Sequence, residues 1–321
     1  MEKPKVSLII SAYNSEKYLA ECLESVFNLN YSKKDFEVIV IDDCSKDKTL
    51  EVAKKFPCKA IRLDENKNVA GARNEGIKIA KGEIMVFLDA DCVAEKNWLK
   101  ELMENQDGKS IVGGVDTSAG EDTVLMKSID FALTSFLGSG GVRRGKFRMA
   151  KYYPRGFTMC IPRKAFEEVG LFKRDMVPSE DAEFDFRAER AGYKLKFASK
   201  AIAFHKRRNT IKSFFRQVYN WGKSRVKLFK VSKKHLEPLY FIPALFLLAF
   251  ISLIILSFFF SFFFKILLTI IIIYLFIILV SGIIAAIKKK EIILLFLVPV
   301  IIFLQHFAYG LGLLVGFFKK N

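Results

Sequence analysis

The chain has 321 residues, of which 51% are hydrophobic, and a formal net charge of +17. The length suggests one large domain or two smaller ones, and the basic residues gather beside an apolar carboxyl-terminal region, which indicates anionic lipids as partner and not nucleic acid. The five cysteines lack paired spacing, which fits a reducing compartment and excludes a Cys-x-x-Cys zinc site.

The first half of the chain alternates short apolar runs with helical patterns. Strands are expected at Val6–Ala12, Phe36–Ile41, Ala60–Asp64 and Ile84–Leu88. Helices are expected from a Ser15 cap to about Asn28, at Thr49–Phe56 and at Ala70–Lys81, before Gly82. Apolar strands separated by helices predict a parallel sheet covered on both faces, with ligands at the carboxyl ends of the strands.

The next part of the chain is less regular. A mobile loop is expected at Gly138–Gly145, a short helix at Ala165–Val169, and a helix at Asp181–Ala191 that Gly192 stops. The run LKFASKAIAFH then reads as a strand that ends at His205.

From Thr210 the pattern becomes that of a basic amphipathic helix. Its apolar positions are Ile211, Phe214, Phe215, Val218, Trp221 and Phe229, at three- and four-residue spacing among lysines and arginines. This pattern favours a helix lying in a membrane interface. The alternative is a helix packed on the domain with a solvated basic face.

Three later segments are long and apolar enough to cross a membrane: Leu239–Phe264, Ile266–Ile287 and Ile292–Phe318. The cation-rich stretches Lys206–Lys234 and Lys288–Lys290 are expected on the cytoplasmic side. Three full crossings would place Lys319 and Lys320 outside, against the same rule. Because Pro299 could break the last segment, the number of crossings, about three, stays open.

The amino terminus carries no signal-peptide pattern, since Val6–Ala12 is too short and too mixed to be a signal core. The part of the chain ahead of the apolar segments is therefore expected on the cytoplasmic side of the membrane. The whole protein is expected in the cell membrane of a prokaryote.

Acidic side chains follow two of the predicted strands. Asp43 stands in Asp42-Asp43-Cys44-Ser45, where a carboxylate can accept hydrogen bonds from a base or a ribose, or can simply cap the next helix. Strand one is followed by Tyr13-Asn14-Ser15-Glu16, so the glycine fingerprint of a dinucleotide-binding dehydrogenase is missing.

The fourth strand ends in Asp89-Ala90-Asp91, and two carboxylates so spaced can share a Mg²⁺ or Mn²⁺ ion or can form a plain acidic turn. Arg73 precedes that strand and can pair with a phosphate, or lie at the surface. Glu180-Asp181 opens a helix and offers either a general base or a cap.

In sequence order, these segments resemble a known family. The runs SLIISAYNSEKYLAECLESV, VIVIDDCSKDKT, GARNEGIKIAKGEIMVFLDAD and SEDAEFDFRAERAGYKL are similar to the family 2 glycosyltransferases of GT-A fold, over about residues 4–210. The resemblance implies an α/β fold with a Rossmann-like, mostly parallel sheet at residues 1–209. The amphipathic interfacial helix (210–236) and the transmembrane helices (237–321) would follow.

The resemblance also implies roles for individual residues. Asp43 would bind the nucleobase with Ala12 and Tyr13, Arg73 the nucleotide, Asp89 ribose or metal, and Asp91 the metal, sometimes assisted by His205. Asp181 would be the catalytic base. The donor sugar and the acceptor would meet Glu180, Arg155, Gly156, Thr158, Gln217 and Trp221. Processive relatives carry Gln-x-x-Arg-Trp, and Asn220 stands here in place of the arginine, which argues against processive synthesis.

The predicted activity is an inverting, metal-dependent transfer from a UDP- or GDP-linked sugar to a hydroxyl of a lipid-linked glycan at the cytoplasmic membrane face. The alternatives are a polyprenyl-phosphate sugar synthase, which glycosylates a phosphate, and an inactive membrane scaffold.

The last apolar segment contains polar and small residues. Gln305 and His306 have either a functional role or an interhelical hydrogen-bonding role. Gly310, Gly312 and Gly316 predict a close approach between helices.

Overall fold

The computed structural model describes residues 4–118, 123–140, 151–231 and 237–318, so part of the predicted loop at Gly138–Gly145 and the terminal pair Lys319 and Lys320 lie outside the described residues. The chain forms two compact units, residues 1–119 with 152–206 and residues 120–151 with 207–321. The domain boundaries drawn at residues 209 and 236 stay a prediction.

The first unit is built on an eight-stranded sheet with the order β3-β2-β1-β4-β7-β6-β8-β5. Its strands are β1 (Val6–Ala12), β2 (Phe36–Asp42), β3 (Lys59–Arg62), β4 (Ile84–Asp89), β5 (Cys92–Ala94), β6 (Ser110–Thr117), β7 (Thr158–Pro162) and β8 (Lys194–His205). Its helices are α1 (Leu19–Phe27), α2 (Thr49–Ala53), α3 (Asn68–Ile79), α4 (Trp98–Glu104), α7 (Arg163–Val169), the short η1 (Arg174–Met176) and α8 (Glu180–Arg190).

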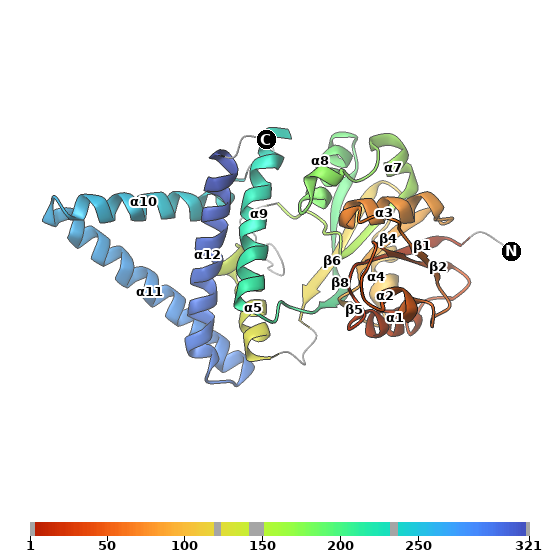
Figure 1. Cartoon of the computed structure of the whole chain (residues 1–321), viewed down its shortest axis with the longest axis horizontal. Coiled ribbons are helices and arrows are strands. Elements are labelled where there is room, and N and C mark those ends of the chain that lie inside the picture. Colours follow the sequence, from red (N-terminus) through yellow and green to blue (C-terminus); the bar gives the residue numbers. More distant parts are fainter. Residues whose placement is uncertain (1–3, 119–122, 141–150, 232–236, 319–321) are drawn as a thin grey trace. The chain divides into compact units, whose positions relative to one another are not determined.

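The four strands predicted from the sequence form the parallel half of this sheet: β1 lies between β2 and β4, and β3 pairs with β2. Alternate residues along β1 enter different apolar clusters. Leu8 and Ile10 pack with α1 and α4, whereas Ile9 packs with α3, α7 and α8. The sheet is therefore covered on both faces, as predicted (Figure 1). The strands β5 and β7 run antiparallel to their neighbours, so the sheet is mixed.

One local prediction was wrong, and one possibility that the sequence left open does not occur. Helix α1 begins at Leu19 and not after a Ser15 cap, because the Ser15 hydroxyl donates to the Tyr13 carbonyl and Tyr18 holds the N-cap position. Pro299 does not break the last helix, which continues through it.

The second unit is helical. It contains α5 (Val124–Thr134), α6 (Phe136–Ser139), α9 (Ile211–Val231), the short η3 (Pro238–Phe241), α10 (Ile242–Ser257), α11 (Ser261–Lys289) and α12 (Leu294–Phe318). Three helical stretches in the described part of the chain are long and apolar enough to cross a membrane: Pro238–Ser257, Ser261–Lys289 and Leu294–Phe318. Helix α9 runs beside α12 (Figure 1).

The small residues of α12 permit the predicted close packing. A Cβ added at Gly312 would lie 3.1 Å from Tyr219 Cα, and one at Gly310 would lie 2.7 Å from the Pro243 carbonyl oxygen. The glycines therefore bring α12 against the backbones of α9 and α10.

His306 and Gln305 make interhelical hydrogen bonds. His306 Nε2 lies 3.1 Å from the Leu137 carbonyl oxygen, and its Nδ1 lies 3.0 Å from the Tyr274 hydroxyl. The carbonyl can only accept, so Nε2 carries the proton and Nδ1 accepts from Tyr274. The Gln305 amide donates to the Gly138 carbonyl. These contacts support the structural role of the two alternatives and fasten α6 to α12.

Candidate active site

The carboxyl ends of β1, β2 and β4 meet at one edge of the sheet. Ala12 is in register with Asp42, and Ser11 with Asp89. The Asp43 amide donates to the Ala12 carbonyl at 2.8 Å. The sequence-predicted residues Ala12, Asp43 and Asp89 therefore lie at the ends of three neighbouring strands, as expected for a ligand-binding edge.

Asp43 is held in place by the loop ahead of α3. Its Oδ1 accepts a hydrogen bond from the Lys67 amide at 2.6 Å, and the Asn66 side chain donates to its carbonyl at 3.1 Å. Burial raises the pKa of Asp43, and hydrogen bonds from the Lys67 and Asn68 amides oppose that rise. Tyr13, next to Ala12 in the chain, is 48% exposed, so its ring is open to a planar ligand.

Two hydrogen bonds that join the loops after β1 and β2 were not predicted from the sequence. The Asn14 side chain accepts from the Lys46 amide at 2.8 Å, while the Asn14 amide donates to the Ser45 hydroxyl at 2.9 Å. Asn14 and Cys44 have φ values of 50° and 63°, in the left-handed region where asparagine is favoured and cysteine is not. The Asn in Tyr13-Asn14-Ser15 was the available signal.

Arg73 is the hub of the site. It is 3% exposed, its Nη2 donates to Asp89 Oδ1 and its Nη1 to Glu180 Oε1, both at 2.8 Å. Burial alone would lower the pKa of Arg73, but the Asp89 and Glu180 carboxylates outweigh it and raise that pKa. Arg73 therefore lies buried between carboxylates from two distant segments, and not at the surface.

Glu180 and Asp181 begin α8. Burial, followed by the neighbouring Asp181 charge, raises the pKa of Glu180 to about 7. Asp181 Oδ2 accepts from the Gly156 amide at 3.2 Å, and its Oδ1 accepts from the Ala182 amide at 2.7 Å. The two backbone amides therefore fix the orientation of the Asp181 carboxylate.

The backbone at Gly156 passes between Arg73 and Asp181, where there is no room for a side chain. A Cβ built on it would lie 2.5 Å from Arg73 Cζ, so any side chain here would collide with the guanidinium. The chain therefore needs glycine where its backbone passes between Arg73 and Asp181.

Asp91 and His205 meet where β5 begins and β8 ends. His205 Nε2 lies 3.4 Å from Asp91 Oδ1, and Cys92 pairs with His205 in the antiparallel β5–β8 register. Asp91, Cys92 and His205 each bring one possible ligand atom within 4.8 Å of the others. Burial raises the pKa of the Cys92 thiol well above its usual value, so the thiol stays protonated and ligates poorly. The oxygen of Asp91 and the nitrogen of His205 remain as a donor set that fits a divalent metal ion.

The remaining predicted residues are placed less directly. The Arg155 carbonyl oxygen accepts a hydrogen bond from the Thr158 amide at 2.9 Å. Thr158 itself is fully buried, and its hydroxyl accepts from Trp98 Nε1 at 2.8 Å. Gln217 and Trp221 lie on α9 of the second unit, where Trp221 packs in the apolar cluster around α12. The roles of all four toward a sugar or an acceptor stay predictions.

Comparison with known proteins decides the family. Residues 7–172 match the sequence profile of glycosyl transferase family 2. The chain belongs to this family. It is therefore a glycosyltransferase, and the resemblance inferred from the sequence is confirmed.

Two curated relatives extend through most of the chain. One is the dolichyl N-acetyl-alpha-D-glucosaminyl phosphate 3-beta-D-2,3-diacetamido-2,3-dideoxy-beta-D-glucuronosyltransferase of Methanococcus voltae, 28% identical over 78% of this chain and 81% of the relative. The other is the glycosyltransferase AglE of Haloferax volcanii, 29% identical over 71% of this chain and 78% of the relative.

The fold has a solved counterpart. The mannosyltransferase PcManGT from Pyrobaculum calidifontis, in complex with GDP-Man and Mn²⁺, superimposes with a TM-score of 0.55 at 20% identity. The match covers 72% of this chain and 65% of that one. The predicted fold class, a GT-A domain followed by apolar helices, is confirmed.

Proposed function

We propose that this glycosyltransferase moves a sugar from a UDP- or GDP-linked donor to a hydroxyl of a lipid-linked glycan, with inversion and with a divalent cation. The observation that carries the proposal is the Arg73 network, which joins Asp89 at the nucleotide edge to Glu180 beside Asp181. The relative from Methanococcus voltae, whose name includes a dolichyl phosphate-linked sugar, supports a lipid-linked acceptor.

The nucleotide end of the donor is assigned to the β1–β2 edge. The exposed Tyr13 ring would lie against the base, and Asp43, fixed by the Lys67 amide, would accept hydrogen bonds from it. Arg73 would face the nucleotide from the inner end of the same site.

A divalent cation fits the pair Asp91 and His205, with Asp89 close by. When bound, Mn²⁺ or Mg²⁺ supplies positive charge to the diphosphate leaving group. The Pyrobaculum calidifontis mannosyltransferase, solved in complex with GDP-Man and Mn²⁺, supports this assignment.

Asp181 is assigned as the base. The acceptor oxygen attacks the anomeric carbon while the bond between that carbon and the diphosphate oxygen breaks. The electron pair of the broken bond leaves with the nucleoside diphosphate. The acceptor proton passes to Asp181, whose carboxylate the Gly156 and Ala182 amides hold ready. A single displacement of this kind inverts the anomeric centre.

The proposed setting is the cytoplasmic face of a prokaryotic cell membrane. Relatives from Methanococcus voltae and Haloferax volcanii support a prokaryotic origin, and the lysines that flank the apolar helices support the side.

The test is a transfer assay on the detergent-solubilised full chain. UDP- and GDP-sugars with Mn²⁺ are offered with polyprenyl phosphate or with a polyprenyl-diphosphate-linked sugar, to the wild type and to Asp181→Asn. We expect transfer to the lipid-linked sugar only, abolished in Asp181→Asn. Transfer to polyprenyl phosphate, only mildly affected by the substitution, would establish the lipid-phosphate synthase instead. Absence of nucleotide binding with every donor would favour the scaffold.

A further inference from the structure

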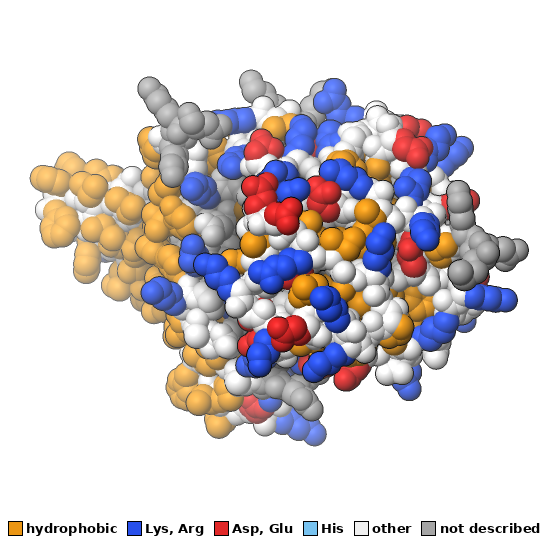
Figure 2. Space-filling model, turned by 45° about the vertical axis from the view of Figure 1, so that its right-hand side comes forward, with side chains coloured by type: hydrophobic (Ala, Val, Ile, Leu, Met, Phe, Trp, Pro, Cys, Tyr) orange, Lys and Arg blue, Asp and Glu red, His pale blue; other side chains and the backbone are white. Residues whose placement is uncertain are grey.

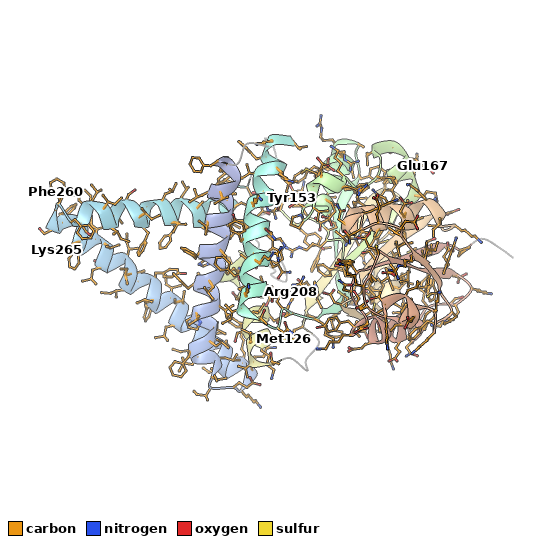
Figure 3. All side chains as sticks on the ribbon, viewed as in Figure 1. Met126, Tyr153, Glu167, Arg208, Phe260 and Lys265 are labelled. Atoms are coloured by element: carbon orange, nitrogen blue, oxygen red, sulfur yellow. The ribbon has the colours of Figure 1, made fainter. Side chains whose placement is uncertain are left out.

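The second unit contains an arrangement that bears on how it meets the membrane. Helices α10 and α11 form a hairpin, which Figure 2 shows covered almost entirely by hydrophobic side chains. Phe260 and Lys265 lie at its far end (Figure 3). Helix α12 is also long and apolar enough to cross a membrane, but its neighbours differ.

Helix α9 accompanies α12 along much of its length, in the same direction. Ring contacts join Phe215 to Phe307 and Phe229 to Phe317. Between them, a Cβ on Gly222 would lie 3.0 Å from the Leu313 amide nitrogen. The two helices therefore share one orientation relative to any membrane.

Helix α9 cannot cross a bilayer. It carries six cations and no acidic residue: Lys212, Arg216, Lys223, Arg225, Lys227 and Lys230. Lysine and arginine are strongly disfavoured in the hydrocarbon core, and this helix distributes them from its first turn to its last. A spanning α12 would carry α9, and these charges, across with it.

The contacts of the hairpin lead to the same orientation. The start of α10 lies against the end of α12, where Phe241 meets Phe317 and Pro243 meets Gly310. The end of α11 lies against the start of α12, where Gly282 meets Leu295. From Leu295 to Gly310 is roughly 22 Å along a helix axis. Helix α12 thus runs from the end of α11 to the start of α10, across the base of the hairpin. In a bundle of three antiparallel spanning helices, α10 would instead begin beside the start of α12.

Cations stand at both ends of α12. Lys288 and Lys289 close α11 just before it, and Lys127 pairs with Glu291 at the same end. At the other end, the Lys223 backbone carbonyl and the Val226 side chain of α9 lie against Gly316, so the part of α9 that carries Lys223, Arg225, Lys227 and Lys230 flanks that end. Because cationic flanks gather on one side of a membrane, both ends of α12 belong on that side.

We propose that α12 lies in the plane of the membrane interface beside α9, and that only the α10–α11 hairpin enters the bilayer. The partner of this helix pair is an anionic lipid surface. The exposed row Phe296, Val300, Phe303 and Phe307 on α12, at helical spacing, meets acyl chains, and the α9 cations meet headgroups. The carboxyl terminus then lies on the same side of the membrane as the α9 cations, which removes the conflict raised by Lys319 and Lys320.

The first test is the side of the carboxyl terminus. Epitope tags are placed at each end of the full chain, and protease access is compared in sealed inside-out and right-side-out vesicles. We expect the two tags to be cleaved in the same vesicles, while a tag inserted after Phe260 is cleaved in the opposite ones. Cleavage of the two terminal tags in opposite vesicles would overturn the proposal.

The second test measures depth. Single fluorophores at Phe296→Cys, Phe303→Cys and Phe317→Cys, with Cys44 and Cys58 replaced by serine, are quenched by lipids labelled at shallow or deep positions. The protein is in vesicles of phosphatidylcholine and phosphatidylglycerol. The matched control is α11, labelled at Phe264, Ile272 and Ile283. On the spanning α11 we expect deep quenching at Ile272 and shallower quenching at Phe264 and Ile283, and along α12 we expect a constant, shallow ratio. A deep probe at Phe303 with shallow ones at both ends would show a spanning α12.

Discussion

Replacing Gly156 by alanine tests whether Arg73 is the hub of the site. The new Cβ would lie 2.5 Å from both Cζ and Nη2 of Arg73, closer than real Cβ atoms approach other heavy atoms. Gly156 does not have a positive φ, so alanine introduces no backbone strain of its own. The guanidinium must move, and it can move only by releasing Asp89 or Glu180.

The magnitude follows from the bonds at stake. A hydrogen bond to a charged group contributes roughly 1.5–3 kcal/mol. Losing one of them and weakening the other costs about 3 kcal/mol, which in kcat/KM is about 100-fold. The Gly156 amide also bonds Asp181, so the same displacement disturbs the proposed base.

The assay is kcat/KM for sugar transfer, with the thermal unfolding midpoint in detergent measured alongside. Gly108→Ala is the control: Gly108 has a φ of 75° and open space around its Cβ, so it reports backbone strain without touching the site. In an Arg73→Ala background, Gly156→Ala should add almost nothing, because its target is gone. If the two losses add, or if Gly156→Ala alone keeps activity within about threefold of wild type, well short of the expected 100-fold, the collision with Arg73 is not what requires glycine.

Three further outcomes are expected. His205→Ala should weaken Mn²⁺ activation at least about tenfold, as judged by titration of activity, since loss of even an outer-shell partner costs about 10–100-fold; unchanged Mn²⁺ dependence would remove His205 from the metal site. The pKa of Glu180 is raised from 4.5 to about 7, so the folded state holds this proton more tightly and loses stability as the pH rises through that interval. Glu180→Gln should therefore gain up to roughly 3 kcal/mol relative to wild type between pH 5 and pH 8. Equal unfolding midpoints for the two proteins at both pH values would contradict this. Gly312→Leu should lower stability by roughly 1–3 kcal/mol, because its side chain meets the Tyr219 backbone. Val300→Leu, on the exposed face, is the matched control, and an equal effect of the two would refute the close packing.

The parallel half of the sheet could be predicted because its strands are continuous apolar runs. Their two-sided burial leaves a local signature, and the acidic residues that follow them mark the ligand edge. Asp43 and Asp89 could be placed on that edge from the sequence for this reason. The antiparallel strand β7 lacks this signature, because it is only five residues long, begins with a threonine and ends at Pro162.

The role of Arg73 as a hub could not be predicted locally. An arginine on a helix has no sequence mark that tells a surface position from a buried one. What keeps it buried is Glu180, 107 residues later, together with a backbone segment at Gly156 that has no side chain. A glycine at position 156 was only a weak signal that the backbone passes close to another group. The folded chain shows that this group is Arg73.

The polar residues of α12 show the same limit from the opposite direction. A histidine and a glutamine in an apolar helix suggest function, because an unsatisfied polar group there is costly. His306 is satisfied at both ring nitrogens, by Tyr274 and by the Leu137 carbonyl. The second partner lies in α6, which comes between β6 and β7 in the chain but belongs to the helical unit. His306 therefore holds this inserted segment on α12 by a hydrogen bond, and its neighbour Gln305 does the same through the Gly138 carbonyl. Polar residues in an apolar helix thus mark a packing partner as readily as they mark a functional site.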